Sequence, residues 1–96
     1  CFAVLIRNTA TVGGIGYHRV RGNHFHKTAT SSSALMRGVT IDGMTHNVIE
    51  GNTFVGQDVG VYLQTGCINS RVDAASDLFN GCTITVLNEG TGNEVA

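Results

Sequence analysis

Four side chains have the chemistry needed to bind a sugar, and they are Arg7, Asp42, Tyr62 and Gln64. Each lies in a short strand-like segment, and aligning these segments places Arg7, Asp42 and Gln64 in one outward column beside Tyr62. A sugar ring stacks on an aromatic face, planar polar groups bond its hydroxyls, and an Arg pairs with a uronic or sialic carboxylate. The plainer interpretation is a solvated face with an Arg7–Asp42 ion pair, which contributes little stability when exposed.

A second charged set, Arg21, Glu50 and Asp73, is expected to stack on another family of strands. Glycoside hydrolysis needs two carboxylates about 5 to 9 Å apart, so Glu50 and Asp73 are weak candidates for a catalytic pair. A lyase would instead need a base near the sugar C5 proton and a cation for the carboxylate, for which Arg7, Arg19 or Arg21 are candidates. The simpler alternative is charge pairing between neighbouring strands.

The sequence gives little support for a metal or a cofactor. His24 and His26 form a His-x-His that puts both rings on one face of a strand, but two histidines are too few for a catalytic metal centre. No segment has the nonapeptide Gly-Asp pattern of calcium-binding β-rolls. The cysteines, Cys1, Cys67 and Cys82, have neither metal-ligand spacing nor a disulfide framework. We therefore expect buried free thiols, no metal and no cofactor.

These residues are positioned by a degenerate internal repeat. Segment 18–25 matches segment 46–54 with one inserted residue, and both read His-x-Val followed by Gly-Asn-x-Phe. A weaker third copy at 70–79 keeps a turn-type Asp where the others have Asn, and its Phe79 is the counterpart of Phe54. The copies therefore predict short strands joined by turns.

A second family of segments lies between these copies and alternates apolar with polar residues, as strands do. Its members are 3–8, 38–43, 60–66 and 83–88. Aligning these segments on Val39, Val61 and Ile84 gives two steps of almost equal length. The step from Val4 to Val39 is much longer and contains a polar insertion near 27–37, which predicts an external loop.

Stacking of equivalent positions predicts columns of similar side chains about 4.8 Å apart. The inward columns are expected to be Val4, Val39, Val61, Ile84 and Ile6, Ile41, Leu63, Val86. The outward columns are expected to be Leu5, Thr40, Tyr62, Thr85 and Arg7, Asp42, Gln64, Leu87. After the turn, Phe25, Phe54 and Phe79 predict an aromatic stack, and Asn23 and Asn52 predict an asparagine ladder.

The long period favours a right-handed parallel β-helix of about four coils over a sandwich or barrel. No segment holds the helical period of about 3.6 residues. We expect a single β-helix segment over 1–96, and a piece of a longer protein because a strand-like run begins at Cys1. Bare terminal coils need covering, so the chain either continues or forms a homotrimer about a three-fold axis. Apolar side chains at outward positions would face that axis, namely Leu5, Leu35, Met36 and Leu87.

Composition argues against two classes of partner. The six Lys and Arg are scattered through a chain of net charge −1, so there is no basic stripe for nucleic acid. The longest apolar run, 2–6, is far shorter than the ~20 residues of a membrane span, and no charged region precedes it. We expect no nucleic-acid partner and no membrane insertion.

The corner motifs are Gly-Asn-His-Phe at 22–25 and Gly-Asn-Thr-Phe at 51–54, and strands such as Gly-Val-Tyr-Leu-Gln-Thr-Gly at 60–66 follow them. These motifs resemble the pectate-lyase-like right-handed β-helix superfamily. Within it, the content of Gly, Ser and Thr and the absence of proline make the chain most similar to bacteriophage tailspike proteins. The resemblance implies a homotrimeric virion or extracellular protein that binds, and often depolymerises, bacterial surface polysaccharide. A fragment of a secreted polysaccharide lyase or glycosidase, and a structural solenoid of an adhesin, are the alternatives.

Overall fold

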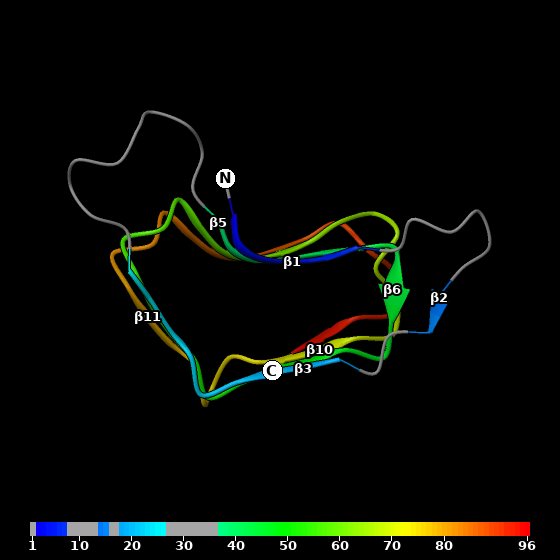
Figure 1. Cartoon of the computed structure of the whole chain (residues 1–96), viewed down its shortest axis with the longest axis horizontal. Helices are drawn as coiled ribbons and strands as arrows, with labels where there is room; N and C mark the ends of the chain where they lie inside the picture. Colours follow the sequence, from blue (N-terminus) through cyan, green and yellow to red (C-terminus); the bar gives the residue numbers. More distant parts are fainter. Residues whose placement is uncertain (1, 8–13, 16–17, 27–36) are drawn as a thin grey trace.

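A computed structural model shows an all-β chain (Figure 1). It describes residues 2–7, 14–15, 18–26 and 37–96, which form strands and turns but no helix. Within this part of the chain there is accordingly no apolar helix that could cross a membrane. All pairings between the described strands are parallel, which confirms the prediction of an all-β fold with parallel strands.

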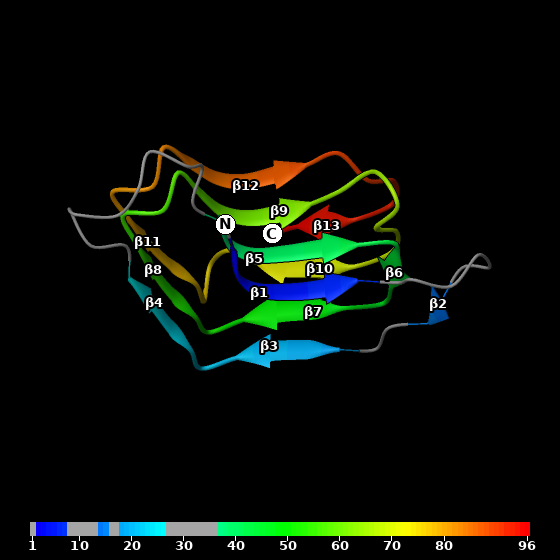
Figure 2. The same cartoon turned by 45° about the horizontal axis from the view of Figure 1, so that its top comes forward.

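The strands of the described residues form four sheets, which we call A to D (Figure 2). Sheet A contains, in spatial order, β1 (Phe2–Arg7), β5 (Arg37–Asp42), β9 (Val59–Leu63) and β12 (Ile84–Asn88). Sheet B pairs β2 (Gly14–Ile15) with β6 (Met44–Thr45). Sheet C contains β3 (Arg19–Arg21), β7 (Val48–Glu50), β10 (Arg71–Asp73) and β13 (Glu94–Val95). Sheet D contains β4 (His24–His26), β8 (Thr53–Val55) and β11 (Leu78–Asn80).

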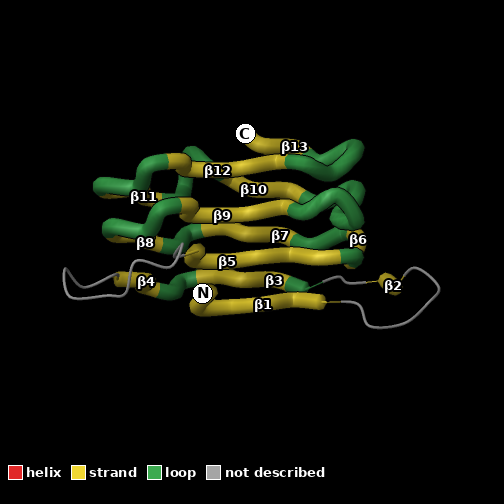
Figure 3. The backbone as a smooth tube through the Cα atoms, turned by 90° about the horizontal axis from the view of Figure 1, so that it is seen from above, coloured by secondary structure: helices red, strands yellow, loops and turns green. Residues whose placement is uncertain are grey.

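The chain visits sheets A, C and D in that order and then returns to sheet A. Each pass, which we call a level, places its strands beside those of the previous pass, as the stacked strands of Figure 3 show. This arrangement is compatible with the coils of the predicted β-helix. Of the predicted insertion near 27–37, residues 27–36 lie outside the described residues, as do Cys1, Leu35 and Met36.

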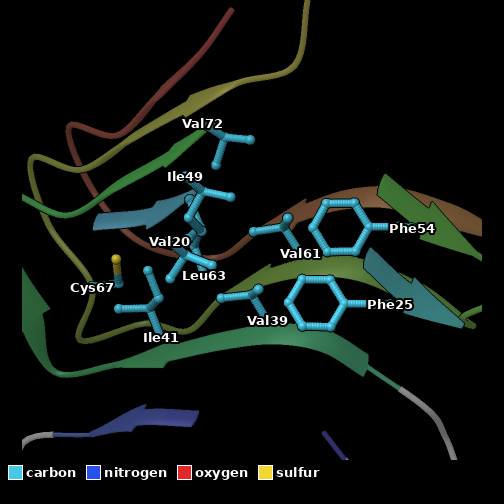
Figure 4. Close-up of a cluster of buried hydrophobic side chains, with 10 residues drawn as sticks. All are labelled: Val20, Phe25, Val39, Ile41, Ile49, Phe54, Val61, Leu63, Cys67 and Val72. Carbon is cyan, nitrogen blue, oxygen red and sulfur yellow. The ribbon is translucent and has the colours of Figure 1, made fainter. Parts of the chain in front are cut away.

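The interior lies between sheets A, C and D, and apolar side chains from all three sheets fill it (Figure 4). Its buried members are Val20, Phe25, Val39, Ile41, Ile49, Phe54, Val61, Leu63, Cys67 and Val72. The predicted aromatic stack is confirmed, because the ring centroids of Phe25 and Phe54 are 5.1 Å apart and those of Phe54 and Phe79 are 5.0 Å apart. The rings of Phe54 and Phe79 are almost parallel, with an angle of 7° between their planes.

Two glycines of sheet A leave space for these rings. A Cβ atom at Gly38 would lie 2.5 Å from Cδ1 of Phe54, and one at Gly60 would lie 2.7 Å from Cε1 of Phe79. Any side chain at these positions would therefore overlap the aromatic stack.

The predicted ladder at the corner between sheets C and D is also confirmed. Asn23 donates through Nδ2 to Oδ1 of Asn52 at 3.2 Å, and Asn52 donates through Nδ2 to Oδ1 of Asp77 at 3.3 Å. Asp77 thus takes the position of an Asn on the third level. Asn52 is buried, and its Nδ2 also donates to the carbonyl of Val20 at 2.9 Å. The ladder therefore satisfies corner groups that would otherwise be buried without partners.

A second ladder, which the sequence analysis did not predict, lies immediately before the strands of sheet C. The backbone N–H of Asn47 donates to Oγ of Ser70 at 3.0 Å, and that of Ser70 donates to Oδ1 of Asn93 at 2.9 Å. The N–H of His18 donates to Oδ1 of Asn47 at 3.2 Å. Each of these bonds joins the residue before a strand of sheet C to the next level.

The register confirms three members of each predicted column in sheet A and shows that the fourth is wrong. Val4 pairs with Val39, and Val39 pairs with Val61, as predicted. On β12, Val86 rather than Ile84 pairs with Val61. The same shift along β12 replaces the predicted Val86 by Asn88, Thr85 by Leu87 and Leu87 by Glu89 in the other columns.

The shift has a local cause, which is a longer corner on the third level. Asp73 pairs with Glu50, and Asp77 bonds to Asn52, so the chain between Asp73 and Asp77 is longer than that between Glu50 and Asn52 on the level below. The extra residues form a turn in which the N–H of Asp77 donates to the carbonyl of Asp73 at 3.1 Å. The step from Val61 to Val86 is therefore as long as the step from Phe54 to Phe79.

Candidate functional site

The outer face of sheet A, which points away from the interior, brings together the residues predicted to bind a sugar. Arg7 pairs with Asp42 in the parallel register of β1 and β5. The N–H of Gln64 donates to the carbonyl of Ile41 at 2.9 Å, which places Gln64 beside Asp42 on the next level. The N–H of Glu89 donates to the carbonyl of Leu63 at 2.8 Å, so Glu89 completes this column where Leu87 was predicted.

Three members of this column are in direct polar contact. Nε of Arg7 lies 3.4 Å from Oδ2 of Asp42. With its amide oriented to donate, Gln64 places its nitrogen 3.2 Å from both oxygens of the Asp42 carboxylate. The Arg7 side chain is 60% exposed, so the ion pair that the plainer interpretation expects is present and contributes little stability.

Tyr62 occupies the neighbouring outward column and is held by two charged residues. Its hydroxyl donates to Oε1 of Glu89 at 2.5 Å. The guanidinium carbon of Arg37 lies 4.8 Å from the centroid of the Tyr62 ring, which is a cation–π arrangement. The hydrogen bond to Glu89 is the main reason that the pKa of Tyr62 is raised, and partial burial adds to it. Tyr62 therefore remains a neutral hydrogen-bonding group at ordinary pH.

We call this surface the Tyr62 face, and its residues are Arg7, Arg37, Asp42, Tyr62, Gln64 and Glu89. Two of them, Arg37 and Glu89, were not among the predicted residues. A signal for Glu89 was present, because Glu89 follows Gln64 at the same interval at which Phe79 follows Phe54. Arg37 could not be found by alignment. In the register it pairs with Val59, yet its side chain reaches Tyr62 further along the same strand.

The weak catalytic candidates lie in the register that was predicted, on sheet C. Arg21 pairs with Glu50, and Glu50 pairs with Asp73. Oε1 of Glu50 lies 3.4 Å from Nε of Arg19 and 3.9 Å from Nε of Arg21, as the simpler alternative of charge pairing expects. Sheets A and C lie on opposite sides of the interior in Figure 1. Glu50 and Asp73 therefore do not join the Tyr62 face in one site.

Few groups are placed to hold a metal or to act as a nucleophile. Among the described residues, no three His, Cys, Asp or Glu side chains gather as metal ligands. Cys67 is buried and Cys82 is half-buried, and neither forms a disulfide. Burial raises the pKa of both thiols, which disfavours the reactive thiolate.

The Tyr62 face is an open surface, because the described part of the chain contains no enclosed pocket. Such a surface can present hydrogen-bonding groups and one aromatic ring to a ligand that lies along it. Comparisons of the chain with protein-family models, with curated proteins and with solved structures find no match.

Proposed function

We propose that this chain is a segment of right-handed parallel β-helix, about four coils long, from a phage tailspike or a similar receptor-binding protein of a virion tail or the extracellular space. We further propose that the segment supports trimer assembly and contacts bacterial surface polysaccharide through the Tyr62 face. The observation that carries the proposal is the row formed by Arg7, Asp42 and Gln64 beside Tyr62.

Four features support the fold part of the proposal. The chain returns to the same sheets in the same order, its strands pair only in parallel among the described residues, and like residues stack between levels. Side-chain ladders at two corners satisfy turn groups from level to level. These are the interactions that a stack of repeated coils requires.

The chemistry of the Tyr62 face supports the polysaccharide part. The column from Arg7 to Glu89 spans four levels, or about 14 Å at roughly 4.8 Å per strand spacing, so it offers polar groups along a short stretch of polymer. The exposed Arg7 guanidinium suits a sugar carboxylate, while Asp42 and Gln64 suit hydroxyl groups. An open surface suits an extended chain better than a small molecule, which binds in concave sites.

A panel of immobilised bacterial surface polysaccharides, neutral and acidic, tests this proposal. We expect the chain to bind at least one acidic polysaccharide, and Arg7→Ala and Tyr62→Ala to weaken that binding roughly tenfold or more, because each removes a charged or stacking contact. Arg71→Ala is the matched control, since Arg71 is an exposed arginine on sheet C. Equal binding by all variants, or no binding by the parent chain to any polysaccharide, would sink the proposal.

A second candidate function, glycoside hydrolysis, is favoured by the position of Glu89. Asp42 and Glu89 lie two levels apart on one face, roughly 9.6 Å between backbones. Backbones at this spacing allow the two side chains to bring their carboxyls to the ~6.5–9.5 Å found in inverting glycosidases, where one carboxyl protonates the leaving oxygen and the other activates water. Gln64, which bonds to Asp42, lies between them.

Release of reducing ends from a bound polysaccharide tests the second candidate. We expect Glu89→Gln and Asp42→Asn to abolish the release, and Glu50→Gln on sheet C to leave it unchanged. Release of an unsaturated sugar product would instead indicate a lyase, and the carboxylate assignment would be wrong.

A further inference from the structure

Two histidines project side by side from the outer surface of sheet D. In β4 the burial alternates, so that His24 and His26 are exposed while Phe25 is buried. The two imidazole rings have their centroids 6.3 Å apart and are inclined at 62°. This edge-on arrangement leaves both rings on one face of the strand, where ring nitrogens can approach a common point.

The backbone beneath this pair is fixed by its neighbours. His24 pairs with Thr53 and His26 pairs with Val55 in the parallel register of β4 and β8. Between them, Phe25 stacks on Phe54 at 5.1 Å in the interior. The two Cβ positions are thus held at the spacing of alternate strand residues, roughly 6.6 Å, and only the exposed side chains need to rotate.

The two rings need only a small rotation to share one metal ion. Imidazole nitrogens bind Zn²⁺ at about 2.0–2.1 Å in tetrahedral geometry, which places two ring centroids about 5.2 Å apart. The rings of His24 and His26, at 6.3 Å, would therefore close by about 1 Å on binding. Imidazole suits borderline divalent ions such as Zn²⁺ and Ni²⁺, whereas Mg²⁺ and Ca²⁺ prefer oxygen ligands. Neither Thr53 nor Val55, the neighbours on β8, offers an imidazole, thiolate or carboxylate.

We propose that His24 and His26 chelate one divalent transition-metal ion, Zn²⁺ or Ni²⁺, with one ring nitrogen each. Water completes the coordination, so the site is an exposed two-histidine chelate and not a structural site with four protein ligands. The proposal is independent of polysaccharide binding, because the pair lies on sheet D and the Tyr62 face lies on sheet A.

Isothermal titration of the full chain with Zn²⁺ and, separately, with Ni²⁺ tests this site. The titration uses a Cys1→Ser background, so that the thiol of residue 1 does not compete for the ion. We expect one ion per chain, and His24→Ala and His26→Ala each to weaken binding at least tenfold, because a chelate loses its second bond. His18→Ala is the matched control, since His18 is also exposed and should leave the affinity unchanged.

Far-UV circular dichroism verifies that each variant keeps its β structure. Unchanged affinity in either His24→Ala or His26→Ala would overturn the chelate, because one histidine would then suffice. A loss of equal size in His18→Ala would also overturn it. As a second readout, magnesium in place of zinc should give no heat of binding above dilution, and a comparable affinity for Mg²⁺ would contradict an imidazole site.

Discussion

At the scale of single residues, Asp77 ends the corner ladder with a carboxyl group in place of an amide. Its Oδ1 accepts the backbone N–H of Asn52 at 2.6 Å, but its buried Oδ2 has no partner. Burial raises the pKa of Asp77 above its ordinary value, and the bonds from Asn52 oppose this only in part. The ionised form is therefore disfavoured in the folded state.

This pKa direction predicts how Asp77→Asn changes stability. Because the folded pKa lies above the unfolded value of about 3.9, the contribution of Asp77 is fully present below that pH and is lost as the pH rises through the folded pKa. Asn stays neutral, and its Nδ2 can donate to the Ile49 carbonyl, the position equivalent to the Val20 carbonyl that Asn52 uses. We expect the variant to be about 1 kcal/mol more stable near pH 7.

Urea unfolding of both proteins at about pH 7 and about pH 4 checks this prediction. The difference should shrink at the lower pH, because Asp77 then becomes protonated in the parent chain. A variant that is less stable than the parent at the higher pH would show that the ladder needs the carboxylate.

Gly60 is a second residue whose identity the packing dictates. A Cβ there would lie 2.7 Å from both Cε1 of Phe79 and the carbonyl oxygen of Thr85. We expect Gly60→Ala to lower the free energy of unfolding by about 1–3 kcal/mol, because the ring and the backbone must both move. Thr65→Ala, at an exposed turn position, is the control for thermal unfolding. Equal melting temperatures for Gly60→Ala and the parent chain would mean that the aromatic stack can accommodate the extra Cβ atom.

The residues of the Tyr62 face show how far the sequence alone could lead. Arg7, Asp42 and Gln64 were correctly aligned because their strands share apolar residues at equivalent positions. The contact between Arg37 and Tyr62 depends on how two long side chains lie across the sheet, and no spacing rule encodes that direction. The bond from Tyr62 to Glu89 was missed for a different reason, which lies in β12.

At the scale of elements, the wrong register of β12 follows from the period of a strand. A shift of one residue moves every apolar side chain to the opposite face, so the sequence pattern excludes it. A shift of two residues keeps the alternation intact, and Ile84 and Val86 are equally suited to an inward column. The longer corner between Asp73 and Asp77 determines which of the two residues pairs with Val61. The length of that corner follows from its turn and not from the apolar pattern of the strand.

The two ladders differ in how well they can be predicted from the sequence. Asn23, Asn52 and Asp77 follow a repeated turn motif, and so the first ladder could be predicted. The second ladder joins Asn47 to Ser70, which share no residue type, and its hydrogen bonds emerge only when the strands are in register. Sequence similarity between coils therefore reveals a ladder only where each level uses the same chemistry.

The aromatic stack predicts which of its phenylalanines contributes most to the stability of the fold. Phe54 is fully buried with a ring on each side, whereas Phe79 is half-buried with one neighbour. We expect Phe54→Ala to cost about 3–5 kcal/mol and Phe79→Ala distinctly less, because less apolar surface loses its partners. Urea unfolding measures both, and Phe54→Leu serves as the milder substitution. A larger loss for Phe79→Ala would contradict a core centred on the middle levels.

At the scale of the whole molecule, the register shows that trimer assembly and polysaccharide binding, as predicted, would use the same surface. Leu5 pairs with Thr40, Thr40 pairs with Tyr62, and Tyr62 pairs with Leu87. Leu5 and Leu87, which were predicted to face a trimer axis, therefore share an outward column with the tyrosine of the Tyr62 face. A face that is buried between subunits cannot also lie against a polysaccharide.

The assembly must then use another surface if the Tyr62 face contacts polysaccharide. We expect light scattering coupled to size exclusion to give a mass near three times the 10.1 kDa of the chain, for both the parent and Leu87→Asp. Leu87→Asp puts a charge into the column beside Tyr62, which an exposed face tolerates and a subunit contact does not. A trimeric parent with a monomeric Leu87→Asp would place the three-fold contact on the Tyr62 face, and polysaccharide binding would have to be sought elsewhere on the molecule.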